Sequence, residues 1–412
     1  MTESIKKSTV TNNFEKNYIR VGVDYFKIIE KPDRYGIIHT ELKKWNRREI
    51  ELDHGKELVK KIAKYDDFII EPDNNGIENS MGKMYNLYNK FPHEPKAGKW
   101  KWTKILLEHI FQNQYELALI YLKVLYQYPK QALPILVLVS QERQTGKTTF
   151  LNWLNVIFGA NMVQIEPDVI GSNFNGEYAT ANIIGIDETI IDKQIAVEKI
   201  KSLATKKFIS VNNKNVQQFT IPFFSKIVIA SNNEDRFMKI DMVEIRFWLR
   251  KLSKPTIENH NIENDMVKEI PAFLHYLTTL QNPDFSKSRM VFTADQLDNE
   301  FLLNVKKESM SGLYHELNEL FSDFFSQNDG AKDIKIIPND IKSKWFKSNN
   351  QISIKYIRNV LKNEYKFKVL ELQKYTPFND GDNRTGRPYI VNREQFTEVE
   401  YNENGEGSEI PF

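Results

Sequence analysis

The segment ILVLVSQERQTGKTTFLNWLNVIF, residues 135–158, constrains the fold of this chain more than any other feature. Its first five residues are all apolar, as in a parallel strand buried on both faces. Apolar residues recur at helical spacing after Gly146, Lys147 and Thr148. A loop between a buried strand and a helix presents backbone N–H groups and a helix N-terminus to a phosphate. The segment therefore predicts an α/β fold with a phosphate-binding loop, in preference to a basic surface turn.

Each polar residue at the end of this loop has a predicted role in binding ATP. Lys147 is expected to reach the β- and γ-phosphates, and the Thr148 hydroxyl is expected to bind Mg²⁺. Gly146 and Thr149 complete the predicted ATP-binding set. Gln141 stands where such loops carry their first glycine, and it could narrow the conformations open to the turn. Because the loop still ends in TGKTT, we expect the site to function.

Two further apolar runs predict strands that end in polar residues. In NIIGIDETIID (182–192), Asp187 is predicted to hold Mg²⁺ through water, and Glu188 is predicted to polarise the attacking water. The alternative is an acidic cap on the helix that follows. In KIVIASNNED (226–235), Asn232 is predicted to orient the lytic water or contact the γ-phosphate. The alternative there is an ordinary asparagine-rich turn.

Three strands that end in a phosphate loop, an acidic pair and an asparagine resemble the superfamily-three helicases, which are AAA+ ATPases of viruses and mobile elements. The segment KIKSLATKKFISVNNKNVQQFTIPFFSKIVIASN (199–232) is similar to a strand–hairpin–strand layout in that family. The family carries a DNA-contacting lysine on this hairpin, and Lys214 occupies the tip. The resemblance is strongest over residues 100–255. It implies an AAA+ P-loop ATPase core with a parallel sheet.

The segment EIRFWLRKL (244–252) resembles the part of the family in which an arginine enters the neighbouring subunit's site. Arg246 matches that arginine best, and Arg250 is the second candidate. The alternative is a surface arginine that pairs with Glu244 or Asp241.

The resemblance is closest to phage and plasmid primase-helicases related to poxvirus-type helicases. A polar residue often replaces the first glycine in these proteins, so Gln141 looks like a subgroup trait. The resemblance implies ATP-driven translocation on single-stranded DNA by a ring, usually a hexamer, with ATP and Mg²⁺ as cofactors. Hairpin lysines of this kind can follow phosphates without reading bases. We find no primase residues before the ATPase segment, so a primase partner is expected on a separate polypeptide.

Six regions are expected along the chain. They are an N-terminal α+β region of uncertain role (1–100), a helical collar (101–130), the ATPase core (131–260), a helical region (261–328), a winged-helix-like domain (329–397) and an acidic tail (398–412). Within the first region, the turn signal KPDRYG predicts a hairpin over residues 18–39. KKWNRRE and GKELVKKIAKYDD are predicted to form short basic helices, and residues 73–103 a long irregular connection.

The segment from Lys332 to Lys368 is strongly basic, with nine lysines and one arginine against three acidic residues. Two predicted helices, NDIKSKWF and SIKYIRNVLKNEY, precede strand-like KFKVLEL and RPYIVN, which is a winged-helix order. This predicts contact with duplex origin DNA through Lys355 and Arg358 on the second helix and Arg384 and Arg387 on the wing. The alternative is a solvated lysine-rich face on a small packing domain.

Composition excludes several classes of function. The chain has no cysteine, so it has no disulfide, thiol nucleophile or thiolate metal site. It has no run of 18 apolar residues, and its polar N-terminus lacks a signal-peptide core, so we expect a cytoplasmic protein without a membrane partner. In KAGKWKWTK (96–104), the two tryptophans would either stack on bases or anchor a loop to the adjacent helices.

Two functions of different classes are compatible with these motifs. The first is a replicative DNA helicase motor from a phage or mobile element. The second is an ATP-switched, origin-binding replication initiator without processive unwinding. Lys214 on the hairpin favours the motor, because a switch has no use for a lysine in a translocating loop.

Overall fold

The computed structural model describes residues 14–73, 80–89, 91–172, 174–187, 194–212, 219–234, 240, 244–256, 259–349 and 351–396. Glu188, Lys214 and the predicted acidic tail lie outside the described residues. The chain divides into two compact units, residues 1–239 with 243–304 and residues 240–242 with 305–412. This division falls within α10 (Glu300–Glu308), so the predicted helical region 261–328 is shared between both units. Among the described helices, none is both long enough and apolar enough to cross a membrane.

The N-terminal part of the first unit contains a four-stranded sheet in the order β3-β2-β1-β4. Its strands and two helices are β1 (Tyr18–Val21), β2 (Asp24–Pro32), β3 (Ile38–Trp45), α1 (Arg47–His54), α2 (Lys56–Lys61) and β4 (Ala63–Tyr65). The hairpin predicted around KPDRYG is confirmed, and Asp33 closes its turn by accepting hydrogen bonds from the N–H groups of Tyr35 and Ile37.

The predicted helix over KKWNRRE begins too early. The strand β3 continues through Trp45, and the helix starts at Arg47 after Asn46, whose side chain accepts a hydrogen bond from the Arg48 N–H. Pairing with β2 therefore overrides the local helical signal of the two lysines. A second small sheet follows, with β5 (Asp67–Ile69), β6 (Ser80–Met81) and β7 (Met84–Asn86). The last two strands lie within residues 73–103, for which the sequence predicts an irregular connection throughout.

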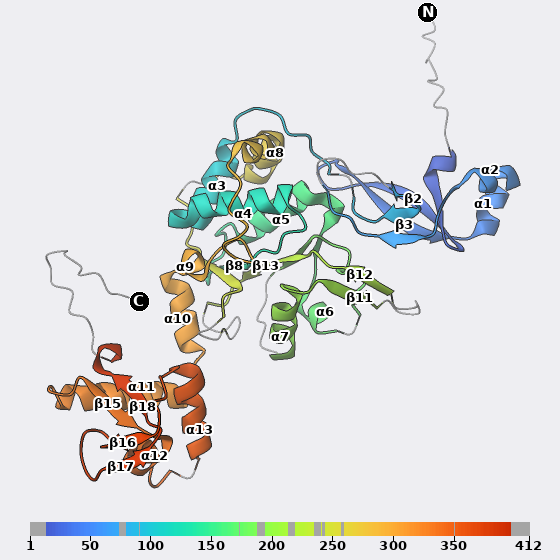
Figure 1. Cartoon of the computed structure of the whole chain (residues 1–412). Coiled ribbons are helices and arrows are strands. Elements are labelled where there is room, and N and C mark those ends of the chain that lie inside the picture. The colour runs from blue at the N-terminus through green and yellow to red at the C-terminus, as the bar shows by residue number, and fades with distance from the viewer. Residues whose placement is uncertain are drawn as a thin grey trace, which may run out of the picture. The chain divides into compact units, whose positions relative to one another are not determined.

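A five-stranded parallel sheet forms the centre of the first unit, as the sequence predicts (Figure 1). Its strands are β8 (Ile135–Val139), β9 (Met162–Gln164), β10 (Ile183–Ile186), β13 (Lys226–Ser231) and β14 (Phe247–Lys251). Their order is β14-β8-β13-β10-β9, and every neighbouring pair is parallel. Every residue of β8 and β13 is buried, which explains why both runs are so apolar.

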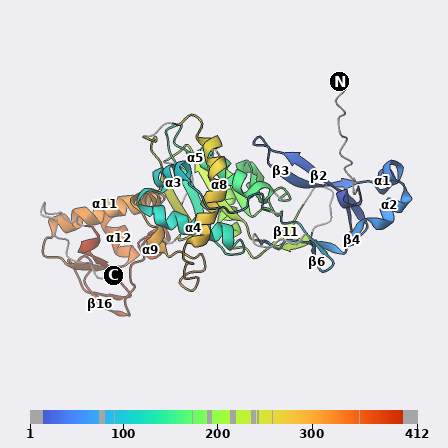
Figure 2. The ribbon, with the colours of Figure 1, turned by 90° about the horizontal axis from the view of Figure 1, so that it is seen from above.

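Helices cover the sheet. One group comprises α3 (Lys101–Phe111), α4 (Tyr115–Gln127), α5 (Lys147–Phe158) and α8 (Ile262–Thr279), which lie together in both views (Figures 1 and 2). Their apolar side chains share one core with β8 and β13. In Figure 1, α6 (Pro167–Gly171) and α7 (Gln194–Leu203) lie on the other side of these strands. The short helix α9 (Ala294–Leu297) completes the unit.

The structure shows how the predicted helical collar is divided and how Trp100 packs. A 3-10 turn at Gln112–Gln114 divides the predicted helical collar (101–130) into α3 and α4, and Gln112 has a positive φ of 45° there. Trp100 packs against Phe273 and Tyr276 of α8, with ring centroids 5.3 Å and 4.7 Å away. Trp100 therefore anchors its loop to the helical layer.

The predicted strand–hairpin–strand segment is an antiparallel pair of β11 (Phe208–Val211) and β12 (Phe219–Pro222). Asn175 fixes its first strand: the Asn175 amide donates to the carbonyl of Ser210, and its side-chain oxygen accepts from the Asn212 N–H at 2.7 Å. Asn175 thereby holds the end of β11 that leads into the connection to β12.

The second unit has its own core of apolar and aromatic side chains, centred on Phe321 and Phe325. Its elements are α11 (Gly312–Gln327), β15 (Asp333–Ile336), α12 (Pro338–Trp345), α13 (Ile354–Asn359) with a π-helical turn (Val360–Glu364), β16 (Gln373–Tyr375), β17 (Arg384–Gly386) and β18 (Tyr389–Asn392). β15 pairs with β18, and β16 with β17, both antiparallel. The predicted strand KFKVLEL makes only an isolated bridge, between Val369 and Tyr389.

Candidate nucleotide site

Four predicted site residues follow strands that end at one edge of the parallel sheet. Lys147 and Thr148 come after β8, Asn232 after β13 and Asp187 after β10. Because β8, β13 and β10 are parallel neighbours, their carboxyl ends meet at this edge. The strand β13 lies between the other two, so Asn232 follows the strand that separates the phosphate loop from Asp187.

The backbone of the phosphate loop is left-handed at Gln144 and Gly146, where φ is 60° and 92°. A second feature favours glycine at 146, since a Cβ there would lie 3.1 Å from Cδ1 of Leu106 on α3. Gln141 is not among the residues with positive φ. The missing first glycine therefore costs this loop no conformational strain.

Lys147 is buried, with 6% of its surface exposed, and its side chain turns back into the loop. Its ammonium donates to the carbonyls of Ser140 and Glu142 and to the Thr145 hydroxyl at 3.1–3.3 Å. Phosphate oxygens can replace such acceptors without moving the helix. Because α5 begins at Lys147, the N–H groups of its first turn lack acceptors within the helix, while the Thr148 side chain is exposed.

A cavity of about 450 Å³ adjoins the loop. Leu106 and His109 of α3 line one wall, Gly146 and Thr149 line the loop side, and residues between 254 and 262 supply the rest. Its volume and mixed apolar and polar lining suit a nucleoside. Sequence reasoning missed this cavity because two of its walls, α3 and residues 254–262, lie more than 140 residues apart in the chain.

His109 connects the cavity wall to the loop. Its Nε2 lies 3.1 Å from the carbonyl oxygen of Thr145. Because a carbonyl only accepts, Nε2 carries the hydrogen, and Nδ1 of the neutral ring is then an acceptor. The Thr145 carbonyl is thereby held on the side of α3.

Arg246 lies at the opposite edge of the sheet, because it precedes β14 and β14 is parallel to β8. Its guanidinium donates from Nε and Nη2 to the two carboxylate oxygens of Glu244 and from Nη1 to the carbonyl of Lys201. Burial alone would raise the pKa of Glu244, but these hydrogen bonds and the nearby cations lower it. Within one chain, Arg246 has the pairing foreseen by the alternative interpretation, and it does not approach the loop.

Arg250, the second candidate, is enclosed within the first unit, with 4% of its surface exposed. Its guanidinium donates to the carbonyl of Ile110 and to the Gln114 side chain. Burial lowers the pKa of Arg250 to about 10, so it stays charged at neutral pH. Arg246 is the more accessible of the two, with 30% of its side chain exposed.

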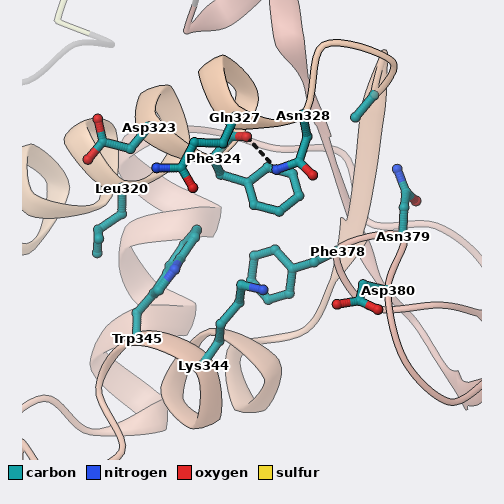
Figure 3. A pocket seen from close by; sticks show the side chains of 11 residues that line it. Leu320, Asp323, Phe324, Gln327, Asn328, Lys344, Trp345, Phe378, Asn379 and Asp380 are labelled. Carbon is teal, nitrogen blue, oxygen red and sulfur yellow. Dashed lines mark hydrogen bonds between the residues drawn. The ribbon is translucent and has the colours of Figure 1, made fainter.

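The second unit has a cavity of about 410 Å³ between α11, α12 and the loop that follows β16 (Figure 3). The Lys344 ammonium lies 5.5 Å from the ring centroid of Phe324 and 4.7 Å from that of Phe378. Asp323 and Asp380 also line the cavity. Two carboxylates against one lysine make this cavity less suited to a polyphosphate than the cavity beside Gly146.

The predicted duplex-binding residues of the second unit differ in their surroundings. Lys355 and Arg358 are exposed on α13, as is Arg387 beyond β17. Arg384 instead pairs with the buried carboxylate of Asp340, which also accepts a hydrogen bond from the Tyr375 hydroxyl. Arg384 therefore fastens the β16–β17 hairpin to α12.

Residues 138–246 match the model of DUF5906, a family of unknown function. The match begins within β8 and ends at Arg246, so it spans the loop, Asp187 and Asn232. A search of curated proteins finds no match.

Solved structures with the same fold are found. An apo structure of the NrS-1 C terminal region (305-718) has a TM-score of 0.65 and 16% identity, and the alignment covers 92% of this chain and 97% of that one. An A form apo structure of the same region gives a TM-score of 0.61 and 15% identity, covering 92% and 96%. At such identities the likeness concerns the fold alone, and it extends over most of the chain.

Proposed function

We propose that this protein is an ATP-dependent DNA helicase of the superfamily-three AAA+ type, acting in replication of a phage or mobile element. The observation that carries the proposal is the shared edge of the sheet, where the loop with Lys147 lies together with Asp187, Asn232 and a nucleoside-sized cavity. The likeness in fold to the NrS-1 C terminal region, which covers 92% of this chain, is compatible with the proposal.

Each residue at this edge has a chemical task in the proposed reaction. Lys147 and the loop N–H groups bind the β- and γ-phosphates, and Thr148 and Asp187 hold Mg²⁺, which neutralises charge on the transferring phosphoryl group. Glu188, outside the described residues, directly follows Asp187 and is assigned to the attacking water. Asn232 is assigned to orient that water. The exposed Thr148 hydroxyl and Asn232 side chain fit these tasks.

The β11–β12 hairpin supports a motor in preference to a switch. Asn175 holds the end of β11 that leads into the connection to β12, through hydrogen bonds with Ser210 and Asn212. Lys214 belongs to the connection between the strands, outside the described residues, and is proposed to hold a DNA phosphate. Phosphate contacts of this kind give binding without sequence preference.

We propose that the protein assembles into a ring of six subunits, because of the position of Arg246. Arg246 lies at the amino ends of the parallel strands, whereas the proposed ATP site lies at their carboxyl ends. It therefore cannot reach the ATP site of its own chain, but it can reach the site of a neighbouring subunit. The second unit is proposed to be a winged-helix-like domain that contacts duplex DNA through Lys355 and Arg358. A separate primase remains a proposed partner.

Measurements of turnover and unwinding test this function. Purified protein should hydrolyse MgATP faster with single-stranded DNA present and should displace a strand from a forked duplex. Lys147→Ala should abolish turnover, while Glu188→Gln should bind ATP and hardly hydrolyse it. Unchanged turnover by Lys147→Ala would overturn the assignment of the site. DNA-stimulated turnover without strand displacement would favour the ATP-switched initiator instead.

A further inference from the structure

A carboxylate contacts the phosphate loop at the position where Gln141 replaces the first glycine. We infer that Glu234, two residues beyond Asn232, is a positioning residue that fixes the first turn of this loop. The effect of Glu234 on ATP affinity rests on the proposed function, whereas its effect on the conformation of the loop does not.

Glu234 joins the ends of three neighbouring strands. One carboxylate oxygen accepts a hydrogen bond from the Gln141 backbone N–H at 3.0 Å. The other lies 2.7 Å from the Lys251 ammonium. Glu234 follows β13, Gln141 follows β8, and Lys251 ends β14. Because β8 lies between β13 and β14, the Glu234 side chain crosses the carboxyl end of β8.

The charge of Glu234 is maintained at neutral pH. Its side chain is only 12% exposed, and burial alone would raise its pKa. The hydrogen bonds from Lys251 and Gln141, together with the charges of Lys251 and Lys147, lower that pKa instead. An ionised carboxylate this near a phosphate loop opposes anion binding, and Lys251 offsets the repulsion. Glu234 can therefore favour ATP binding only through the conformation that it imposes on the loop.

Two further hydrogen bonds fix Glu142, the next residue of the same turn. The Glu142 carboxylate accepts a hydrogen bond from the Lys254 N–H at 3.1 Å, and the Glu142 N–H donates to the Ser140 hydroxyl. The turn at 140–142 is thus held from both β13 and the segment after β14. Hydrogen bonds to fixed carboxylates supply the order that a tight glycine turn would otherwise provide.

Two substitutions separate loop positioning from general stability. Glu234→Ala removes the acceptor and should weaken MgATP binding about ten- to hundredfold, while kcat at saturating ATP stays within about threefold. Glu234→Gln keeps an oxygen acceptor for the Gln141 N–H and should stay within about threefold of the wild-type Kd. In the wild-type background, Lys251→Met should weaken MgATP binding, because it leaves the Glu234 carboxylate without its cation. In the Glu234→Gln background, the same substitution should hardly change MgATP binding. Glu263→Gln, which alters a carboxylate bonded to Tyr35, is the matched control.

Hydrogen exchange of the full chain without nucleotide gives a readout independent of ATP. The peptide over residues 140–147 should exchange faster in Glu234→Ala and at the wild-type rate in Glu234→Gln. Wild-type exchange in Glu234→Ala, or equal loss of ATP affinity in both variants, would overturn the positioning role. If the wild type binds no MgATP at all, the proposed function fails, and exchange still decides the role of Glu234.

Discussion

Lys147 and Arg246 lie at opposite ends of the strands of the same parallel sheet. Lys147 follows the carboxyl end of β8, whereas Arg246 precedes the amino end of the parallel neighbour β14. At ~3.3 Å per residue, the five residues of β14 separate these ends by roughly 16 Å. If Arg246 serves the proposed nucleotide site, it can therefore do so only in a neighbouring chain.

This separation predicts complementation between two inactive variants. Arg246→Ala should bind ATP normally but hydrolyse it about 10³-fold more slowly, because transition-state charge is no longer neutralised by an arginine. Mixed with Glu188→Gln under subunit exchange, it should recover part of the activity, since wild-type Glu188 and wild-type Arg246 then meet at shared interfaces. Steady-state ATPase assays of the mixtures measure the recovery. Mixtures that stay inactive, in a protein that sediments as a monomer with ATP and DNA, would contradict the ring.

A side chain at position 146 is predicted to weaken ATP binding. Gly146→Ala must adopt a left-handed φ, at about 1–2 kcal/mol, and its Cβ would press on Leu106. ATP affinity should fall roughly tenfold or more, as measured by titration with a fluorescent analogue. Adding Leu106→Ala should restore only the part of the affinity that steric pressure on Leu106 removes. Gly171→Ala is the control, because nothing lies within 4 Å of its added Cβ.

Lys214 is predicted to couple ATP turnover to DNA. Lys214→Ala should keep basal ATPase activity but abolish both stimulation by single-stranded DNA and strand displacement, because the hairpin can no longer hold a phosphate. Weakened binding should be similar for all DNA sequences, since phosphates carry no sequence information. Lys207→Ala, just before β11, controls for removal of one lysine near the hairpin. Normal unwinding by Lys214→Ala would contradict its role.

Duplex binding by the second unit is predicted to depend on α13. Removing Lys355 and Arg358 together should weaken binding of duplex DNA and reduce the slope of log K against log salt by about 0.9 for each phosphate that the protein no longer neutralises. Fluorescence anisotropy at several salt concentrations measures the slope. Lys347→Ala, an exposed lysine beyond α12, serves as the comparison. An unchanged slope would favour the solvated-face interpretation.

The Glu244–Arg246 pair is predicted to make stability depend on pH in the acid range. The folded-state pKa of Glu244 is lowered, so its contribution is present above the unfolded value of about 4.3 and is lost as pH falls through the folded value. Glu244→Gln should lower the free energy of unfolding by about 1.5–3 kcal/mol at pH 7. Urea unfolding at a series of pH values should show this difference shrink below about pH 4. A constant difference would contradict the linkage.

The sequence alone predicted the parallel sheet, the strand–loop–helix unit that contains Gly146, and the antiparallel pair beyond it. These features depend on local patterns: apolar runs such as residues 135–139, helical periodicity after Lys147, and short strands around a polar turn. The sequence placed the first basic helix too early, because pairing of β3 with β2 outweighs local propensity.

Only the tertiary structure decided which distant residues meet. Strand order set Arg246 at the far edge and brought Glu234 across β8 to Lys251, and neither relation follows from spacing along the chain. The cavity between α3 and residues 254–262 likewise depends on how helices pack over the sheet. Local patterns fix each element because they act within a few residues. Long-range contacts depend on the packing of the whole core, which no single segment encodes.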